Sequence, residues 1–143
     1  MKMTAVFLHF TGNCREALDY YAGIFEVEPK EIVTYGEAPS NPNTSGNKDG
    51  NADKIMYSEI DVRGLRVMMS DMPDGIPATL GDNVSIVVES DDLEDLKAIF
   101  AKFEKGSKIY MPLEETFWSK GYAMIADKFG TQWHFSYRDV LTK

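Results

Sequence analysis

Apolar residues recur at helical spacing in two segments of the chain, residues 13–25 and 91–103. Spacings of three and four residues put apolar side chains on one face, so each segment predicts an amphipathic helix packed on a core. Each begins with a capping residue followed three positions later by Glu, Asn13 with Glu16 and Asp91 with Glu94. The apolar positions are Ala17, Leu18, Tyr21, Ile24 and Phe25 in the first segment and Leu96, Ile99, Phe100 and Phe103 in the second.

The two helical segments belong to an internal repeat. Leu18 and Leu96 are 78 residues apart, whereas Gly64 and Gly130, near the ends of the two halves, are 66 apart. The difference of 12 (78 − 66) indicates an insertion after the first helix. Residues 37–53 are rich in Asn, Gly, Ser and Pro, a composition typical of loops. We therefore expect a mobile loop over 37–53.

Alternation of apolar and polar residues predicts strands around each helix. Both halves then have the order β-α-β-β-β, which predicts an α+β protein of one domain, residues 1–143. Module one spans 4–71 and module two spans 83–138. The expected strands are 4–10, 31–35, 55–62 and 65–71 in module one and 83–89, 108–111, 122–127 and 131–137 in module two.

Strand alternation also separates two faces of the predicted sheet. The residues expected under the helices are Val6, Leu8, Phe10, Val67, Met69, Val84, Ile86, Val88, Trp133 and Phe135. The opposite face is mixed and contains Phe7, His9, Tyr57, Glu59, Arg66, Met68, Ser70, Ser85, Val87, Gln132, His134 and Ser136. A mixed face is either solvent surface or the wall of a concave binding site. Both modules have such a mixed face, and a face exposed to solvent would not need the apolar side chains of Phe7, Met68 and Val87. We therefore expect the modules to form a curved mixed sheet around a small-molecule cavity.

Charge and cysteine content narrow the classes of function. A formal net charge of −8 and a pI near 4.7, with no basic run, disfavour nucleic acid and anionic membranes as partners. Cys14 is the only cysteine and the N-terminus resembles no secretory signal, so we expect a cytoplasmic protein without disulfides. Cys14 is expected to be a small residue at a helix start, although a thiolate beside Arg15 is the alternative.

Four segments carry a resemblance to a known family: FTGNCREALDYY at 10–21, DKIMYSEI at 53–60, MPLEETFW at 111–118 and ADKFGTQW at 126–133. In family order over nearly the whole chain, they resemble the PhnB-like branch of the glyoxalase, bleomycin resistance and dioxygenase superfamily, also called vicinal oxygen chelate proteins. The resemblance implies paired β-α-β-β-β modules, usually in a homodimer, and cavities whose ligands vary between members. Relatives have carried a ubiquinone methyltransferase label, but the chain has no glycine-rich turn after a strand that would bind a nucleoside cofactor.

Metal-dependent members of this superfamily use a His and a Glu from each module. Aligned on this chain, those positions fall near Ala5, Met68, Asn83 and His134. Ala and Met cannot supply the oxygen and nitrogen ligands that divalent metals take, so we predict no metal and no other cofactor. Tyr57 also stands where the PhnB-like pattern often has His. A metal site outside the family pattern, formed by His9, Glu59 and His134, is the alternative.

The leading hypothesis is a metal-independent small-molecule-binding protein. Arg66 favours an anionic or strongly polar group, and aromatic residues offer stacking surface. In the segment that connects the expected strands 108–111 and 122–127, Glu114 and Glu115 are either solvated charges or ligand contacts, and Trp118 is the better candidate for the cavity wall. The rival hypothesis is a metal-dependent lyase, isomerase or dioxygenase of the same superfamily, and a purely structural partner protein is a third. The predicted ligand-binding residues are Phe7, His9, Tyr57, Glu59, Arg66, Met68, Trp118 and His134.

Overall fold

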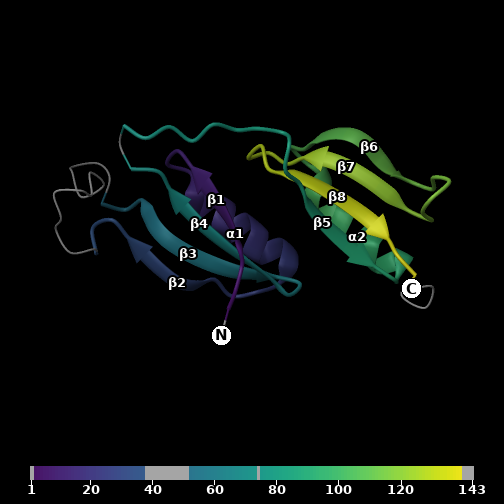
Figure 1. The fold of residues 1–143 in the computed structure, drawn as a ribbon, viewed down its shortest axis with the longest axis horizontal. Helices are drawn as coiled ribbons and strands as arrows, with labels where there is room; N and C mark the ends of the chain where they lie inside the picture. The colour runs from purple at the N-terminus through teal and green to yellow at the C-terminus, as the bar shows by residue number, and fades with distance from the viewer. Residues whose placement is uncertain (1, 38–51, 74, 140–143) are drawn as a thin grey trace. The chain divides into compact units, whose positions relative to one another are not determined.

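A computed structural model describes residues 2–37, 52–73 and 75–139 of the 143-residue chain. The chain divides into two compact units, and the boundary between them along the sequence falls between Thr79 and Leu80. Figure 1 shows the elements of both units. The units correspond to the two modules expected from the repeat. That they form one domain stays a prediction.

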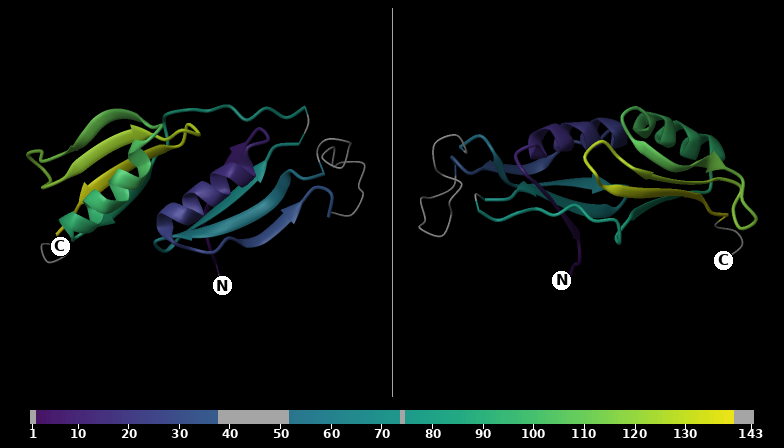
Figure 2. Two further views of the ribbon diagram at one scale, coloured as in Figure 1. Left: turned by 180° about the vertical axis from the view of Figure 1, so that it is seen from behind. Right: turned by 90° about the horizontal axis from the view of Figure 1, so that it is seen from above.

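Module one has the predicted β-α-β-β-β order. Its four-stranded sheet has the order β1-β4-β3-β2, in which β1 and β4 are parallel and the other neighbours are antiparallel. Helix α1 packs against β3 and β4 and covers one face of this sheet (Figure 2). The elements are β1 (Val6–Phe10), α1 (Cys14–Phe25), β2 (Lys30–Thr34), β3 (Ile55–Val62) and β4 (Leu65–Asp71).

Module two repeats this topology. Its four-stranded sheet has the order β5-β8-β7-β6, with β5 and β8 parallel, and α2 packs against β5, β6 and β8. Strand β6 extends to Glu114, three residues past the predicted end at Met111, because its pairing with β7 continues to Tyr122. The elements are β5 (Ile86–Ser90), α2 (Leu93–Glu104), β6 (Lys108–Glu114), β7 (Tyr122–Ala126) and β8 (Gln132–Tyr137).

The helix-packed cores follow the predicted alternation of the strands. Val67 and Met69 are buried in module one, and Trp133 and Phe135 are buried in module two. The ring of Phe103 lies 4.9 Å from Trp133 and 5.4 Å from Phe135, measured between centroids. Burial of such aromatic side chains is the largest single source of stability in a small core.

Three of the predicted core positions differ in the structure. Val84 is 70% exposed because β5 begins only at Ile86, so the alternation does not reach back to it. Val6 and Leu8 are half-buried, since β1 is an edge strand with β4 on one side only. The remaining core residues of that set, Phe10, Val67, Met69, Ile86, Val88, Trp133 and Phe135, are buried.

The predicted helix caps are confirmed only in part. Asn13 is the N-cap residue of α1, as predicted, but its side chain forms no capping hydrogen bond. Instead Asp71, at the end of β4, accepts hydrogen bonds from the backbone N–H of Gly12 (2.8 Å) and of Cys14 (3.0 Å). In α2 the cap is Asp92 and not Asp91, because Asp92 Oδ1 accepts from the N–H groups of the second and third helical residues.

The strand registers refine the sequence repeat. Glu59 pairs with Met68 in module one, and Met124 pairs with His134 in module two. Strand β4 therefore matches β8 at an offset of 66 (134 − 68), whereas β3 matches β7 at 65 (124 − 59), because the second hairpin loop is one residue longer. Gly64 and Gly130 both have positive φ, 96° and 91°, which L side chains adopt only with strain.

The first strands of the modules are offset by 80. Phe7 pairs with Met68, and Val87 pairs with the matching residue His134 (87 − 7). Ser85, and not Asn83, is consequently the counterpart of Ala5. The predicted match was displaced because it was counted from the helix caps.

The predicted mobile loop, 37–53, falls almost wholly outside the described residues. At its two ends the ladder between β2 and β3 continues, with the Gly36 N–H donating to the Ala52 carbonyl (2.9 Å). Among the described residues, no helix is long and apolar enough to cross a membrane.

Candidate functional site

Six of the eight predicted site residues lie on the face of the module-one sheet that α1 does not cover. Strand alternation and register place them there: Phe7 is paired with Met68, and Met68 with Glu59. We call this surface the module-one open face. Its predicted site residues are Phe7 and His9 from β1, Tyr57 and Glu59 from β3, and Arg66 and Met68 from β4.

Three of these side chains form a closed hydrogen-bonded network. The Arg66 Nε donates to Glu59 Oε2 at 2.7 Å, and Arg66 Nη2 donates to the Tyr57 hydroxyl at 2.9 Å. The Tyr57 hydroxyl donates in turn to Glu59 Oε2 at 3.1 Å. The Glu59 side chain is only 16% exposed and Arg66 is 38% exposed. The carboxylate is thus shielded by its two partners, and the guanidinium is held in one orientation.

The pKa values of two groups in the network, the Tyr57 hydroxyl and the Arg66 guanidinium, are shifted. The pKa of the Tyr57 hydroxyl is raised, first by burial and then by its hydrogen bond to Glu59. The hydrogen bond from Arg66 to Glu59 is the main cause that raises the pKa of the Arg66 guanidinium. Both shifts favour the protonated hydroxyl and guanidinium, which are the forms that donate the hydrogen bonds of the network.

Aromatic rings lie beside this network. Phe7 and His9 are stacked at 4.5 Å between ring centroids, and Phe7 meets Tyr57 edge-on at 6.2 Å. Phe7 remains 40% exposed, while the His9 Nδ1 is 3.1 Å from the Ser70 hydroxyl. The face therefore offers a rigid aromatic surface next to a fixed polar network.

The other two predicted residues, Trp118 and His134, belong to module two. They meet through Tyr122, whose ring is edge-on to both, at 5.4 Å from Trp118 and 5.5 Å from His134. The Tyr122 hydroxyl is hydrogen-bonded to the His134 Nδ1. His134 thus points away from the helix-packed core, as predicted. Tyr122 itself was missed, although the offset of 65 makes it the counterpart of Tyr57.

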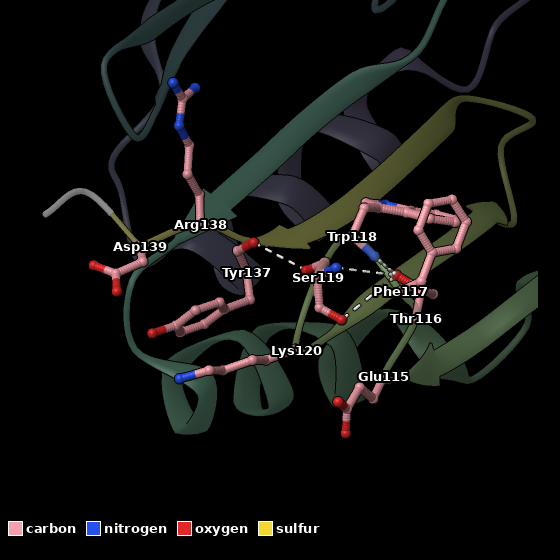
Figure 3. Close-up of a pocket in the computed structure, with 9 residues that line it drawn as sticks. All are labelled: Glu115, Thr116, Phe117, Trp118, Ser119, Lys120, Tyr137, Arg138 and Asp139. Atoms are coloured by element: carbon pink, nitrogen blue, oxygen red, sulfur yellow. Dashed lines mark hydrogen bonds between the residues drawn. The ribbon is translucent and has the colours of Figure 1, made fainter. Parts of the chain in front are cut away.

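A pocket of about 440 Å³ lies beside the connector between β6 and β7 (Figure 3). The Ser119 hydroxyl, 2.9 Å from the Tyr137 carbonyl, ties the connector to the end of β8. The Lys120 ammonium lies over the Tyr137 ring, 5.4 Å from its centroid. Of the eight predicted site residues, only Trp118 lines this pocket. The lining residues are Glu115, Thr116, Phe117, Trp118, Ser119, Lys120, Tyr137, Arg138 and Asp139.

Cys14 has no nucleophilic role in this geometry. It is fully buried, and burial together with the nearby Asp71 carboxylate raises its pKa to about 12. A thiolate is the reactive form, so the interpretation of Cys14 as a packed residue is the one that the structure favours.

The family metal positions do not fit a metal ion. Ala5 and Met68 offer no nitrogen or oxygen side-chain ligand, and Ser85 replaces Asn83 at the third position, which leaves His134 as the one common metal ligand of the four. Over residues 2–37, 52–73 and 75–139, no three His, Cys, Asp or Glu side chains gather closely enough to bind one. The alternative triad of His9, Glu59 and His134 draws on both units and stays a prediction.

Two β-α-β-β-β modules, each with parallel first and last strands, define the class of paired-module proteins that was expected from the repeat. The chain belongs to the Glyoxalase/Bleomycin resistance protein/Dioxygenase superfamily, which it matches over residues 5–135. It is similar to the curated Protein YjdN of Escherichia coli (strain K12), with 31% identity over 133 residues that cover 89% of each chain.

Solved structures agree with this assignment. Protein PA1353 from Pseudomonas aeruginosa is 27% identical, with a TM-score of 0.84, over 96% of this chain and 98% of the other. A Bacillus cereus structure described as a PhnB protein and putative 3-demethylubiquinone-9 3-methyltransferase is 23% identical, with a TM-score of 0.79, over 96% and 100% of the two chains. The latter likeness shows the fold alone. The expected membership in the glyoxalase, bleomycin resistance and dioxygenase superfamily is confirmed by the family match over residues 5–135.

Proposed function

We propose that this protein binds a small organic molecule on the module-one open face, and that binding requires no metal ion. The observation that carries the proposal is the combination of a shielded Arg66–Glu59–Tyr57 network with the stacked Phe7 and His9 rings. Ligand sites typically join apolar walls to a few oriented polar groups. Trp118 and His134 lie in module two and stay predicted ligand-binding residues.

Thermal-shift screening of the full-length protein tests the proposal directly. After dialysis against a chelator, a library of metabolites and antibiotics should contain compounds that raise the unfolding temperature, because ligands that bind only the folded state stabilise it. Phe7→Ala should abolish the shift, whereas Val87→Ala, its exposed counterpart in module two, provides the matched control. A library that never moves the unfolding temperature would contradict binding.

Metal-dependent catalysis as a lyase, isomerase or dioxygenase is the rival function. Elemental analysis of the purified protein separates the two, together with thermal shifts in zinc, iron, manganese or nickel salts. Metal at one equivalent per chain, removed by the chelator with loss of ligand binding, would replace our proposal by the rival.

A homodimer is a further part of the proposal and rests on the superfamily resemblance alone. Light scattering of the purified protein should give twice the chain mass of 16.1 kDa. A monomer mass at high protein concentration would exclude the dimer without affecting the ligand proposal.

A further inference from the structure

The proposed ligand site has an arginine, but the arginine is already neutralised. Both Arg66 contacts that define the network are made to the protein itself, at 2.7 Å to a carboxylate and 2.9 Å to a hydroxyl. An incoming carboxylate or phosphate would have to compete with Glu59 at the same guanidinium. Breaking a shielded ion pair leaves an uncompensated charge, and that cost opposes anion binding.

The charges around the network cancel as well. Register places Lys30 opposite Glu59 and Asp61 opposite Arg66, and directly opposed residues share one face of a sheet. These four residues contribute two positive and two negative charges. Glu31 adds a further negative charge that acts on Arg66 and Tyr57. The face as a whole therefore does not attract anions.

The uncharged surface that remains is aromatic. The Phe7 ring is stacked on His9 and meets Tyr57 edge-on, so the three rings are mutually fixed. A guanidinium held in one orientation also stacks on aromatic rings. We propose that the ligand of the module-one open face is a flat aromatic molecule without negative charge. From the sequence alone, Arg66 favoured an anionic or strongly polar group, whereas the aromatic residues already suggested a ligand that stacks on them. This inference rests on the proposed function.

Three naphthalene probes separate charge from shape. 2-Naphthoate, 2-naphthamide and 2-naphthamidine share one ring system and carry a negative, a zero and a positive charge. In calorimetric titrations of the wild-type protein, we expect the amide and the amidine each to bind at least tenfold more tightly than naphthoate.

Glu59→Gln should reverse this preference. The change keeps the size of the side chain but leaves the Arg66 charge without its carboxylate, so naphthoate affinity should rise at least fivefold and naphthamidine affinity should fall. Glu89→Gln is the matched control, because it removes the same charge from the exposed Arg138–Glu89 pair (3.5 Å) of module two. That variant should keep the wild-type order of the three probes.

Each outcome decides the inference. If the wild-type protein binds naphthoate most tightly, the inference that the ligand carries no negative charge is wrong, whereas the proposal of small-molecule binding still stands. If none of the probes binds, the flat aromatic class is wrong, whereas the proposed function fails only if the wider thermal-shift screen is also empty. Should Glu59→Gln not fold by circular dichroism, Arg66→Gln tests the same pair from the other side. It should strengthen naphthamidine binding, and unchanged affinities for all three probes would contradict the inference.

Discussion

The two modules have the same topology and register but different chemistry on their open faces. Where module one has Glu59, Arg66 and Met68, the matching positions of module two hold Met124, Gln132 and His134. Tyr57 and Tyr122 are matching open-face residues, and the hydroxyl of each is hydrogen-bonded within its own face. Backbone pairing and helix packing thus repeat, because they need only apolar residues at alternate positions, whereas the side chains facing outward are free to differ.

The helix starts of the two modules differ in the same way. Asp92 caps α2 from the adjacent residue, but α1 is capped by Asp71, which is 57 residues away in sequence from Cys14. Asp71 Oδ2 also accepts from the Ile55 N–H at 2.9 Å. The cap of α2 is local, while the cap of α1 joins the helix to two strands.

The largest difference between the modules should appear when matching core residues are replaced and the loss of unfolding free energy is measured. Trp133→Ala should destabilise the protein by about 3–5 kcal/mol, and Val67→Ala, at the matching position of module one, by about 1.5–3 kcal/mol. Trp133 loses both its packing on Phe103 and the hydrogen bond from its Nε1 to Asp127 (2.8 Å). Urea denaturation followed by circular dichroism measures both. The control, His134→Ala, should cost less than about 1 kcal/mol; an equal loss in Trp133→Ala and His134→Ala would refute the assignment of faces.

The second largest difference should appear when the capping residues of the two helices are replaced. Asp71→Ala should cost about 3 kcal/mol or more, because three backbone N–H groups lose a buried charged acceptor. Asp92→Ala should cost about 1 kcal/mol, the usual value for an exposed N-cap. Both losses can be measured from the urea midpoints of the variants, provided that the dependence of the unfolding free energy on urea concentration is unchanged. Similar losses in the two variants would mean that the long-range cap adds nothing beyond a local one.

The Cys14 thiol makes the stability of module one depend on alkaline pH. Its pKa in the folded protein is about 12 against an ordinary 9.0, so the unfolded chain ionises first. The free energy of unfolding should therefore fall as pH rises from 9 toward 12, by roughly 1.4 kcal/mol for each unit of pH. Cys14→Ala should remove this part of the slope. A thiol reagent at pH 8 offers an independent check, since rapid labelling of the folded protein would show that the thiol is accessible.

The smallest effects should be the coupling free energies that involve Tyr57 and Tyr122, the tyrosines at matching positions of the two modules. Tyr57→Phe and Arg66→Met belong to one network, so their double variant should show a coupling of about 0.5–1.5 kcal/mol. Tyr57→Phe and Tyr122→Phe involve hydrogen-bonded partners in different modules, and their effects should add within about 0.5 kcal/mol. Two double-mutant cycles on unfolding free energies make the comparison. Strong coupling between the two tyrosines would show that the open faces act as one network.

Much of the fold followed from the pattern of apolar residues. Helical spacing located α1 and α2, and alternation put Trp133 and Phe135 on one side and His134 on the other, since both periods are properties of the local backbone. The same alternation collected the six predicted site residues of module one on one face.

Only the tertiary structure decided which of these residues are partners. The sequence placed Arg66, Glu59 and Tyr57 on one face, but their network depends on the register of β3 against β4 and on side-chain rotamers. Tyr122 was missed because one extra residue in the β7–β8 loop shifts the repeat from 66 to 65. The role of Asp71 was equally hidden, since its partners are brought together by chain folding over 16 residues to Ile55 and 57 to Cys14. Local periodicity determines faces and elements, whereas hydrogen bonds between distant residues require the assembled sheet.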